Sequence, residues 1–157
     1  MKHHIVAGIA SLFLATVLHA ADSAAPSPPS VYDPALAAKV GADDYGMHKY
    51  VLVILKTGPK PMADTPERKE MFKGHFANMQ RLAKEGVLAY AGPLDGVEGR
   101  RGIFILAVDG IEAAKQQVAT DPVIISGEMV AEYHAHYGSA ALMLVNDLHS
   151  QVAKKQM

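Results

Sequence analysis

One long amphipathic helix, enclosed between two β-rich runs, constrains the fold of this chain more than any other feature. Residues 50–56 are apolar and rich in β-branched side chains, which predicts a strand, and Gly58-Pro59 ends it. Thr65-Pro66 is a helix start signal, and Gly86 is a helix stop signal. Between them, apolar residues recur with a period of about 3.6 residues on one helix face: Phe72, Phe76, Met79, Leu82 and Ala83.

The rest of the chain repeats this alternation and fills one domain. The further predicted elements are strands at 87–91, 102–108 and 128–137 and helices at 111–119 and 140–152, with Gly92-Pro93 ending the first of these strands. The order is β-α-β-β-α-β plus a C-terminal helix. It predicts an α+β fold of ferredoxin-like type, a four-stranded antiparallel sheet with two helices on one face. The other face needs cover, so we expect a homodimer unless the C-terminal helix covers it.

The ends of the chain differ in composition from its middle. Residues 1–20 combine a basic start, an apolar stretch of about 14 residues and a small final residue, and crossing a bilayer takes about 20 apolar residues. These features predict a secretory signal peptide and a periplasmic or secreted protein, with an uncleaved anchor as the alternative. Residues 21–47 are predicted as a linker and N-terminal extension, 48–138 as the α+β domain and 139–157 as a C-terminal helix and tail.

Composition excludes several classes of function. The 157 residues include 15 Lys or Arg and 16 Asp or Glu, so no basic surface marks a nucleic-acid partner. The absence of cysteine excludes disulfides, thiolate metal sites and a cysteine nucleophile. The chain also lacks the glycine motifs that bind phosphates and dinucleotides. We therefore expect a small-molecule ligand or substrate, no cofactor, no nucleic acid, and no membrane contact after signal cleavage.

Two polar residues are candidates for proton-transfer chemistry. His75 lies beside Phe76 on the apolar face of the long helix, so it points at the sheet. It is either a core histidine held by one hydrogen bond or a general acid or base. Asp121 precedes Pro122, a common pair at a helix N-cap, and the alternative role for its carboxylate is to orient an imidazole ring. Local sequence leaves both pairs of alternatives open.

Three further polar residues alternate along the last predicted strand. Glu132, His134 and His136 share one face, and the opposite face is more apolar, so we expect this row to point away from the helices. Two imidazoles and a carboxylate on one face are a candidate zinc or copper site. The alternative is a polar row at an interface.

Three short motifs occur in a fixed order within the predicted domain. Residues 74–82 read Gly-His-Phe-Ala-Asn-Met-Gln-Arg-Leu, and residues 86–93 read Gly-Val-Leu-Ala-Tyr-Ala-Gly-Pro. The third motif is Thr120-Asp121-Pro122 with Gly127 five residues after the proline. In these motifs the segment 49–138 resembles the YCII-related domain family, although Phe76 stands where that family more often has leucine. The resemblance implies a ferredoxin-like fold related to the dimeric α+β barrel proteins.

The resemblance also implies a catalytic pair and a substrate-binding set. In that family the histidine of the first motif and the aspartate of the third are the proposed dyad, which here are His75 and Asp121. Many members carry an arginine shortly before the histidine. In this chain an anion-orienting role falls instead to Lys73, and Gly92 and Pro93 complete the predicted substrate-binding residues.

These observations lead to one functional expectation and two alternatives. We expect an exported small-molecule enzyme of proton-transfer type, a lyase or an isomerase. One alternative is a non-catalytic periplasmic dimeric module that binds a small ligand or a metal. The other is a purely structural dimer.

Overall fold

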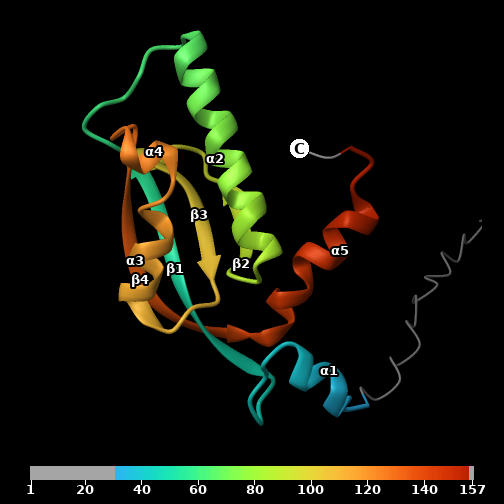
Figure 1. Cartoon of the computed structure of the whole chain (residues 1–157). Helices are drawn as coiled ribbons and strands as arrows, with labels where there is room; N and C mark the ends of the chain where they lie inside the picture. Colours follow the sequence, from blue (N-terminus) through green and yellow to red (C-terminus); the bar gives the residue numbers. More distant parts are fainter. Residues whose placement is uncertain (1–30, 156–157) are drawn as a thin grey trace, which may run out of the picture. The chain divides into compact units, whose positions relative to one another are not determined.

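Four antiparallel strands form one sheet in the order β2-β3-β1-β4 (Figure 1). The strands are β1 (Met47–Thr57), β2 (Leu88–Pro93), β3 (Arg100–Leu106) and β4 (Met129–Ser139). This computed structural model describes residues 31–155, and it confirms the predicted ferredoxin-like α+β architecture. The predicted signal peptide and the first part of the predicted linker lie outside the described residues.

Three helices cover one face of the sheet: α2 (Pro66–Lys84), α3 (Gly110–Val118) and α4 (Pro122–Ile125) (Figure 1). The predicted start of α2 is confirmed, because the Thr65 side chain accepts a hydrogen bond from the backbone N–H of Arg68 at 3.3 Å. Gly86 follows the helix with a φ of 73°, a left-handed conformation that glycine adopts without strain. The N-cap residue Thr65 and the glycine at position 86 therefore set the two ends of α2.

The main apolar core lies between these helices and the sheet. The central strands β1 and β3 and the three helices all contribute to it, and its buried members include Val51, Val53, Leu55, Phe104, Leu106, Leu82, Ala114, Val118 and Val123. Ala131 and Tyr133 of β4 pack against the same cluster. Since alternate residues of a strand point to opposite faces, Glu132 and His134 point away from the helices, as predicted.

One predicted strand boundary was wrong. Gly92 and Pro93 are the last two residues of β2, so the strand runs two residues beyond its predicted end: Gly92 pairs with Ile103 and Pro93 with Gly102. The strand β2 is at the edge of the sheet and has a neighbour on one side only. A proline, which has no N–H to donate, is tolerated at such an edge.

The other face of the sheet is only partly covered. Leu142 and Met143 pack there against the small buried cluster of Tyr50, Ala89 and Ile105. They belong to η2 (Ala140–Leu144), a 3-10 helix that continues as α5 (Val145–Val152), so the single C-terminal helix predicted for 140–152 is divided. The end of this segment is not packed, because Leu148 and Val152 are exposed.

The two segments outside the predicted domain contact each other. The N-terminal extension contains the short helix α1 (Pro34–Lys39), and Lys39 forms an ion pair of 3.2 Å with Asp147 of α5. The side chain of Asn146 donates a hydrogen bond of 2.7 Å to the backbone oxygen of Leu88, which fixes α5 beside the edge strand β2. Within residues 31–155 no helix is long and apolar enough to cross a membrane.

Candidate active site

The long helix α2 and the junction between α3 and α4 bring His75 and Asp121 together. Nδ1 of His75 lies 2.9 Å from each carboxylate oxygen of Asp121. Both side chains are buried: the histidine residue is 7% exposed and the aspartate 0%. The contact expected from the family resemblance is confirmed, at a distance inside the usual range of about 2.6–3.2 Å.

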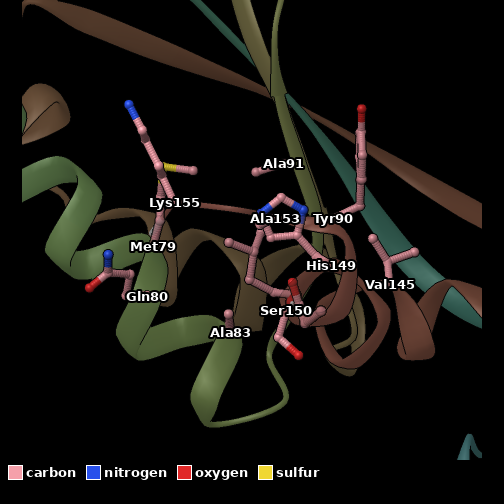
Figure 2. Close-up of a pocket in the computed structure, with 12 residues that line it drawn as sticks. Met79, Gln80, Ala83, Tyr90, Ala91, Val145, His149, Ser150, Ala153 and Lys155 are labelled. Atoms are coloured by element: carbon pink, nitrogen blue, oxygen red, sulfur yellow. Dashed lines mark hydrogen bonds between the residues drawn. The ribbon is translucent and has the colours of Figure 1, made fainter. Parts of the chain in front are cut away.

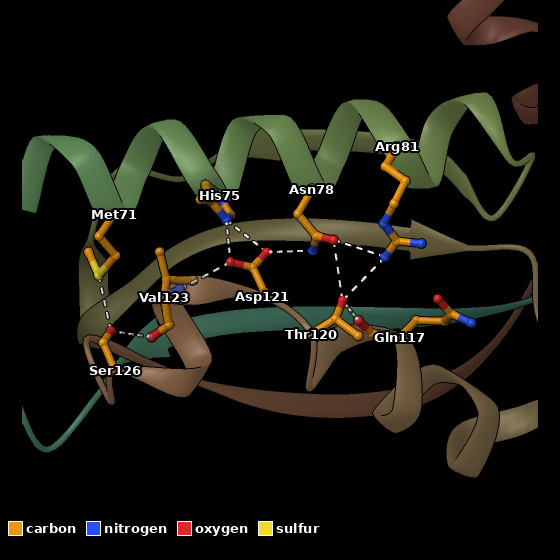
Figure 3. Close-up of polar contacts among 9 residues, drawn as sticks. All are labelled: Met71, His75, Asn78, Arg81, Gln117, Thr120, Asp121, Val123 and Ser126. Atoms are coloured by element: carbon orange, nitrogen blue, oxygen red, sulfur yellow. Dashed lines mark hydrogen bonds and ion pairs between the residues drawn. The ribbon is translucent and has the colours of Figure 1, made fainter.

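Asp121 also caps the helix α4. Its Oδ1 accepts a hydrogen bond from the backbone N–H of Val123 at 3.1 Å, and its Oδ2 accepts one from the side-chain amide of Asn78 at 3.3 Å (Figure 3). The two roles that local sequence left open, N-cap and imidazole partner, are therefore filled by one carboxylate. Because the Asp121 carboxylate accepts in each of these contacts, the hydrogen between it and the imidazole is on Nδ1 of His75.

The side chain of Asn78, which donates to Asp121, is itself held by two further polar side chains. Oδ1 of Asn78 accepts hydrogen bonds from Arg81 at 2.9 Å and from the hydroxyl of Thr120 at 3.2 Å (Figure 3). The same hydroxyl lies 2.7 Å from the backbone oxygen of Gln117. Sequence reasoning missed Asn78 and Thr120. Their positions could have indicated them, because Asn78 lies three residues after His75 on the same helix face and Thr120 directly precedes Asp121.

Three aromatic rings surround the imidazole of His75. Phe72 meets it edge-on at 5.9 Å, Phe76 lies tilted at 5.4 Å, and Phe104 of β3 stacks on it at 6.0 Å between ring centroids. Phe76, predicted on the packed face of the helix, is 45% exposed. The histidine therefore lies between an apolar wall and a charged partner.

The second ring nitrogen of His75 is the atom available to a ligand. Nε2 has no hydrogen-bond partner among residues 31–155, whereas every fully buried side-chain nitrogen or oxygen in that range has one. Nε2 is consequently not completely buried, although the residue as a whole is only 7% exposed. With the hydrogen on Nδ1, the lone pair of the ring is on Nε2.

The predicted substrate-binding residues are not gathered at this pair. Lys73 lies on the outer surface of α2, where its amino group pairs with Glu70 at 2.9 Å and its side chain is 75% exposed. Gly92 and Pro93 are both in the edge strand β2, paired with β3. A side chain at position 92 would meet the Tyr90 hydroxyl at 2.9 Å, so the glycine leaves room for that ring.

A buried ion cluster near the start of α2 was not foreseen from the sequence. The carboxylate of Glu128, 1% exposed, accepts hydrogen bonds from Arg68 at 2.7 Å and from the backbone N–H of Met62 at 2.6 Å. Arg101 approaches it to 3.9 Å. Burial raises the pKa of Glu128, but the Met62 hydrogen bond and the two arginines outweigh it, so the pKa lies below its usual value.

This ion cluster is connected to the aromatic wall around His75. The guanidinium of Arg68 lies over the Phe72 ring at 4.7 Å from its centroid, and that ring meets His75 edge-on. The contact is a cation–π interaction. The buried carboxylate of Glu128 thus fixes the side chain that packs on one wall of the candidate site.

The polar row on β4 does not form a metal site. Nε2 of His134 lies 2.7 Å from Glu132, and Lys56 approaches the same carboxylate to 3.5 Å. The His136 ring instead lies beside Tyr50, at 6.2 Å between centroids. Across residues 31–155 no group of three or more His, Cys, Asp or Glu side chains is placed to hold a metal ion. Glu132, His134 and His136 therefore do not converge on one point, as three ligands of a metal ion would.

Comparison with known proteins identifies the family. No curated protein matches the chain in sequence. The YCII-related domain matches residues 49–134, more than half of the 157 residues, and this segment contains His75, Asp121 and all the side chains that hold them. The chain therefore belongs to the YCII-related domain family.

Proposed function

We propose that this protein is a small-molecule enzyme of proton-transfer type, a lyase or an isomerase, in which His75 is the general base. The observation that carries the proposal is the buried contact of 2.9 Å between Nδ1 of His75 and Asp121. A carboxylate on one ring nitrogen fixes the tautomer and the orientation of the imidazole and leaves the other nitrogen free to accept a proton.

The proposed step moves one proton twice. Nε2 of His75 takes a proton from the bound substrate, and the imidazolium that forms is stabilised by the Asp121 carboxylate. In an isomerase the same proton returns to another atom of the substrate. In a lyase it goes to the leaving group, or to solvent after the leaving group departs. No redox partner is needed, so the protein's own groups balance the step.

The surroundings of His75 favour a substrate with an apolar body. Phe72, Phe76 and Phe104 present ring surfaces around the imidazole. Aromatic walls bind apolar or aromatic groups and exclude water, which strengthens the electrostatic contacts inside a site. A small carbonyl compound with an acidic C–H bond and an apolar substituent fits these features.

Proton exchange tests this proposal and does not require an identified substrate. The protein is incubated in D2O with a panel of small carbonyl compounds that carry acidic C–H bonds, and loss of the C–H signal is followed by NMR. We expect exchange above the buffer rate for at least one apolar member of the panel. Exchange at the buffer rate for every member, including those shown to bind, contradicts the proposal and favours the non-catalytic ligand-binding module.

We also propose that the protein is exported and acts as a homodimer. The composition of residues 1–20 supports export, as a cleavable signal peptide. The partly exposed sheet face supports the dimer, because η2 covers only one part of it and leaves Ile54 and Ile103 partly exposed. A second copy placed on that face removes these apolar side chains from water.

Mass spectrometry of the exported protein tests both proposals. We expect a denatured mass that corresponds to a chain beginning at Ala21, and a native mass of twice that value at micromolar concentration. A denatured mass that retains Met1–Ala20 contradicts export by a cleaved signal. A native monomer contradicts the dimer and leaves η2 as the only cover of the sheet face.

A further inference from the structure

A cavity of about 360 Å³ lies between α2, β2 and α5, away from the His75–Asp121 pair. Volumes of about 300–1,000 Å³ are usual for small-molecule sites, so this one suits a small ligand. None of its lining residues belongs to the pair, and α5, which forms one wall, lies outside the matched family segment. The cavity is therefore formed partly by the family domain and partly by the segment that follows it.

The wall and floor of the cavity are mainly apolar. Met79 and Ala83 contribute from α2, Leu88 and Ala91 from β2, and Val145 from α5. The hydrogen bond of 2.7 Å from Asn146 to the Leu88 backbone oxygen holds the α5 wall in place. An apolar group of a ligand placed there is removed from water, which favours binding.

The polar lining carries basic and neutral groups only. Lys155 and His149 both line the cavity, and none of the described residues around it is acidic (Figure 2). Across residues 31–155 neither side chain forms a hydrogen bond or an ion pair. In Figure 2 the Lys155 amino group and the Tyr90 hydroxyl extend to the same side of the view, away from the Ser150 side chain. Nothing within the described part of the protein neutralises the charge of Lys155.

We propose that this cavity binds a small amphiphilic carboxylate, with its apolar chain on the Met79–Leu88 side and its carboxylate at Lys155. Charge complementarity and the apolar lining together select this class over neutral or cationic ligands. A carboxylate at an ammonium group forms a charge-assisted hydrogen bond, the stronger kind in proteins. The site is independent of the proton-transfer chemistry proposed for His75.

Calorimetric titration of the full exported chain with sodium octanoate tests the proposal. We expect binding of octanoate, weaker binding of the neutral octanamide and none of octylammonium. Lys155→Gln weakens octanoate binding about tenfold, as the loss of one charge-assisted hydrogen bond implies, while its neighbour Lys154→Gln, which does not line the cavity, leaves the affinity unchanged. Ala153→Phe, which fills the cavity from its rim, abolishes binding with an unchanged melting temperature.

Several results would overturn it. If octanamide binds as tightly as octanoate, the site does not require a carboxylate. If Lys154→Gln and Lys155→Gln lose octanoate affinity equally, the affinity comes from general surface charge and not from a specific contact with Lys155. A His75→Gln protein that no longer binds octanoate assigns the ligand to the other site. Retained octanoate binding in His75→Gln supports the cavity whether or not that variant loses proton exchange.

Discussion

Replacement of Glu128 by glutamine is expected to lower the free energy of unfolding by about 3–5 kcal/mol at neutral pH. The carboxylate is buried and is shared by Arg68, Arg101 and the backbone N–H of Met62. Glutamine keeps the shape but removes the charge, which leaves the Arg68 guanidinium partly buried without its partner. Chemical denaturation followed by circular dichroism measures the change.

The pH dependence of this effect follows from the lowered pKa of Glu128. Burial raises that pKa, but the Met62 hydrogen bond and the arginines lower it below the ordinary value of 4.5. Because the folded-state pKa is below the unfolded one, the stabilisation is fully present above about pH 4.5 and is lost as the pH falls through the folded value. We therefore expect the gap between wild type and Glu128→Gln to close in acid.

Glu132 lies in β4, the strand that begins directly after Glu128, and provides the matched control. Its carboxylate is exposed and pairs with Lys56 and His134 at the surface, where ion pairs contribute little. Glu132→Gln should therefore leave the unfolding free energy nearly unchanged. Equal destabilisation by Glu128→Gln and Glu132→Gln would show that the buried cluster does not stabilise the fold in the way its geometry indicates.

The second large effect concerns the candidate dyad. His75→Gln is expected to reduce proton exchange by about 10²–10⁴-fold, the usual contribution of a positioned general base. Asp121→Asn should cause a loss of similar size, because the asparagine can turn its amide toward Nδ1 and favour the wrong imidazole tautomer. Its side-chain oxygen can still accept the Val123 N–H, so the N-cap of α4 is retained. Deuterium exchange monitored by NMR measures both losses.

Stability measurements separate catalysis from packing in these variants. His75→Gln should lose exchange with little change in unfolding free energy, because its amide can still donate to Asp121. His75→Ala leaves that buried carboxylate without its partner, so it should lose both exchange and stability. A loss of several kcal/mol in His75→Gln with exchange retained would instead identify His75 as a core histidine held by one hydrogen bond. His134→Gln, a change of an exposed histidine on β4, serves as the control and should retain both exchange and stability.

The sequence was sufficient to predict the elements whose ends carry strong local signals. Thr65-Pro66 and Gly86 delimit α2, and the helical period then places His75 toward the sheet. The meeting of His75 with Asp121, 46 positions apart, was beyond local patterns and came from the family resemblance. The extension of β2 through Gly92 and Pro93 was missed because a proline is tolerated there only in an edge strand, a property of the assembled sheet.

The buried cluster of Glu128 was not predictable for the same reason. A glutamate after a glycine resembles any surface turn, and only the packed structure brings it to Arg68, 60 positions away in the chain. The C-terminal segment shows the opposite error. One helix was predicted for 140–152, but the chain forms η2 and then α5, and Leu148 and Val152 are exposed to solvent.

The double use of the Asp121 carboxylate has a consequence for how related chains diverge. One carboxylate both starts the α4 helix and holds the imidazole, so a relative without the proposed chemistry can keep the aspartate as a helix cap alone. His75 has no comparable second role, because it caps no helix. Among relatives of this chain, an aspartate at the position of Asp121 therefore says little about retained activity. Whether a histidine occupies the position of His75 is more informative.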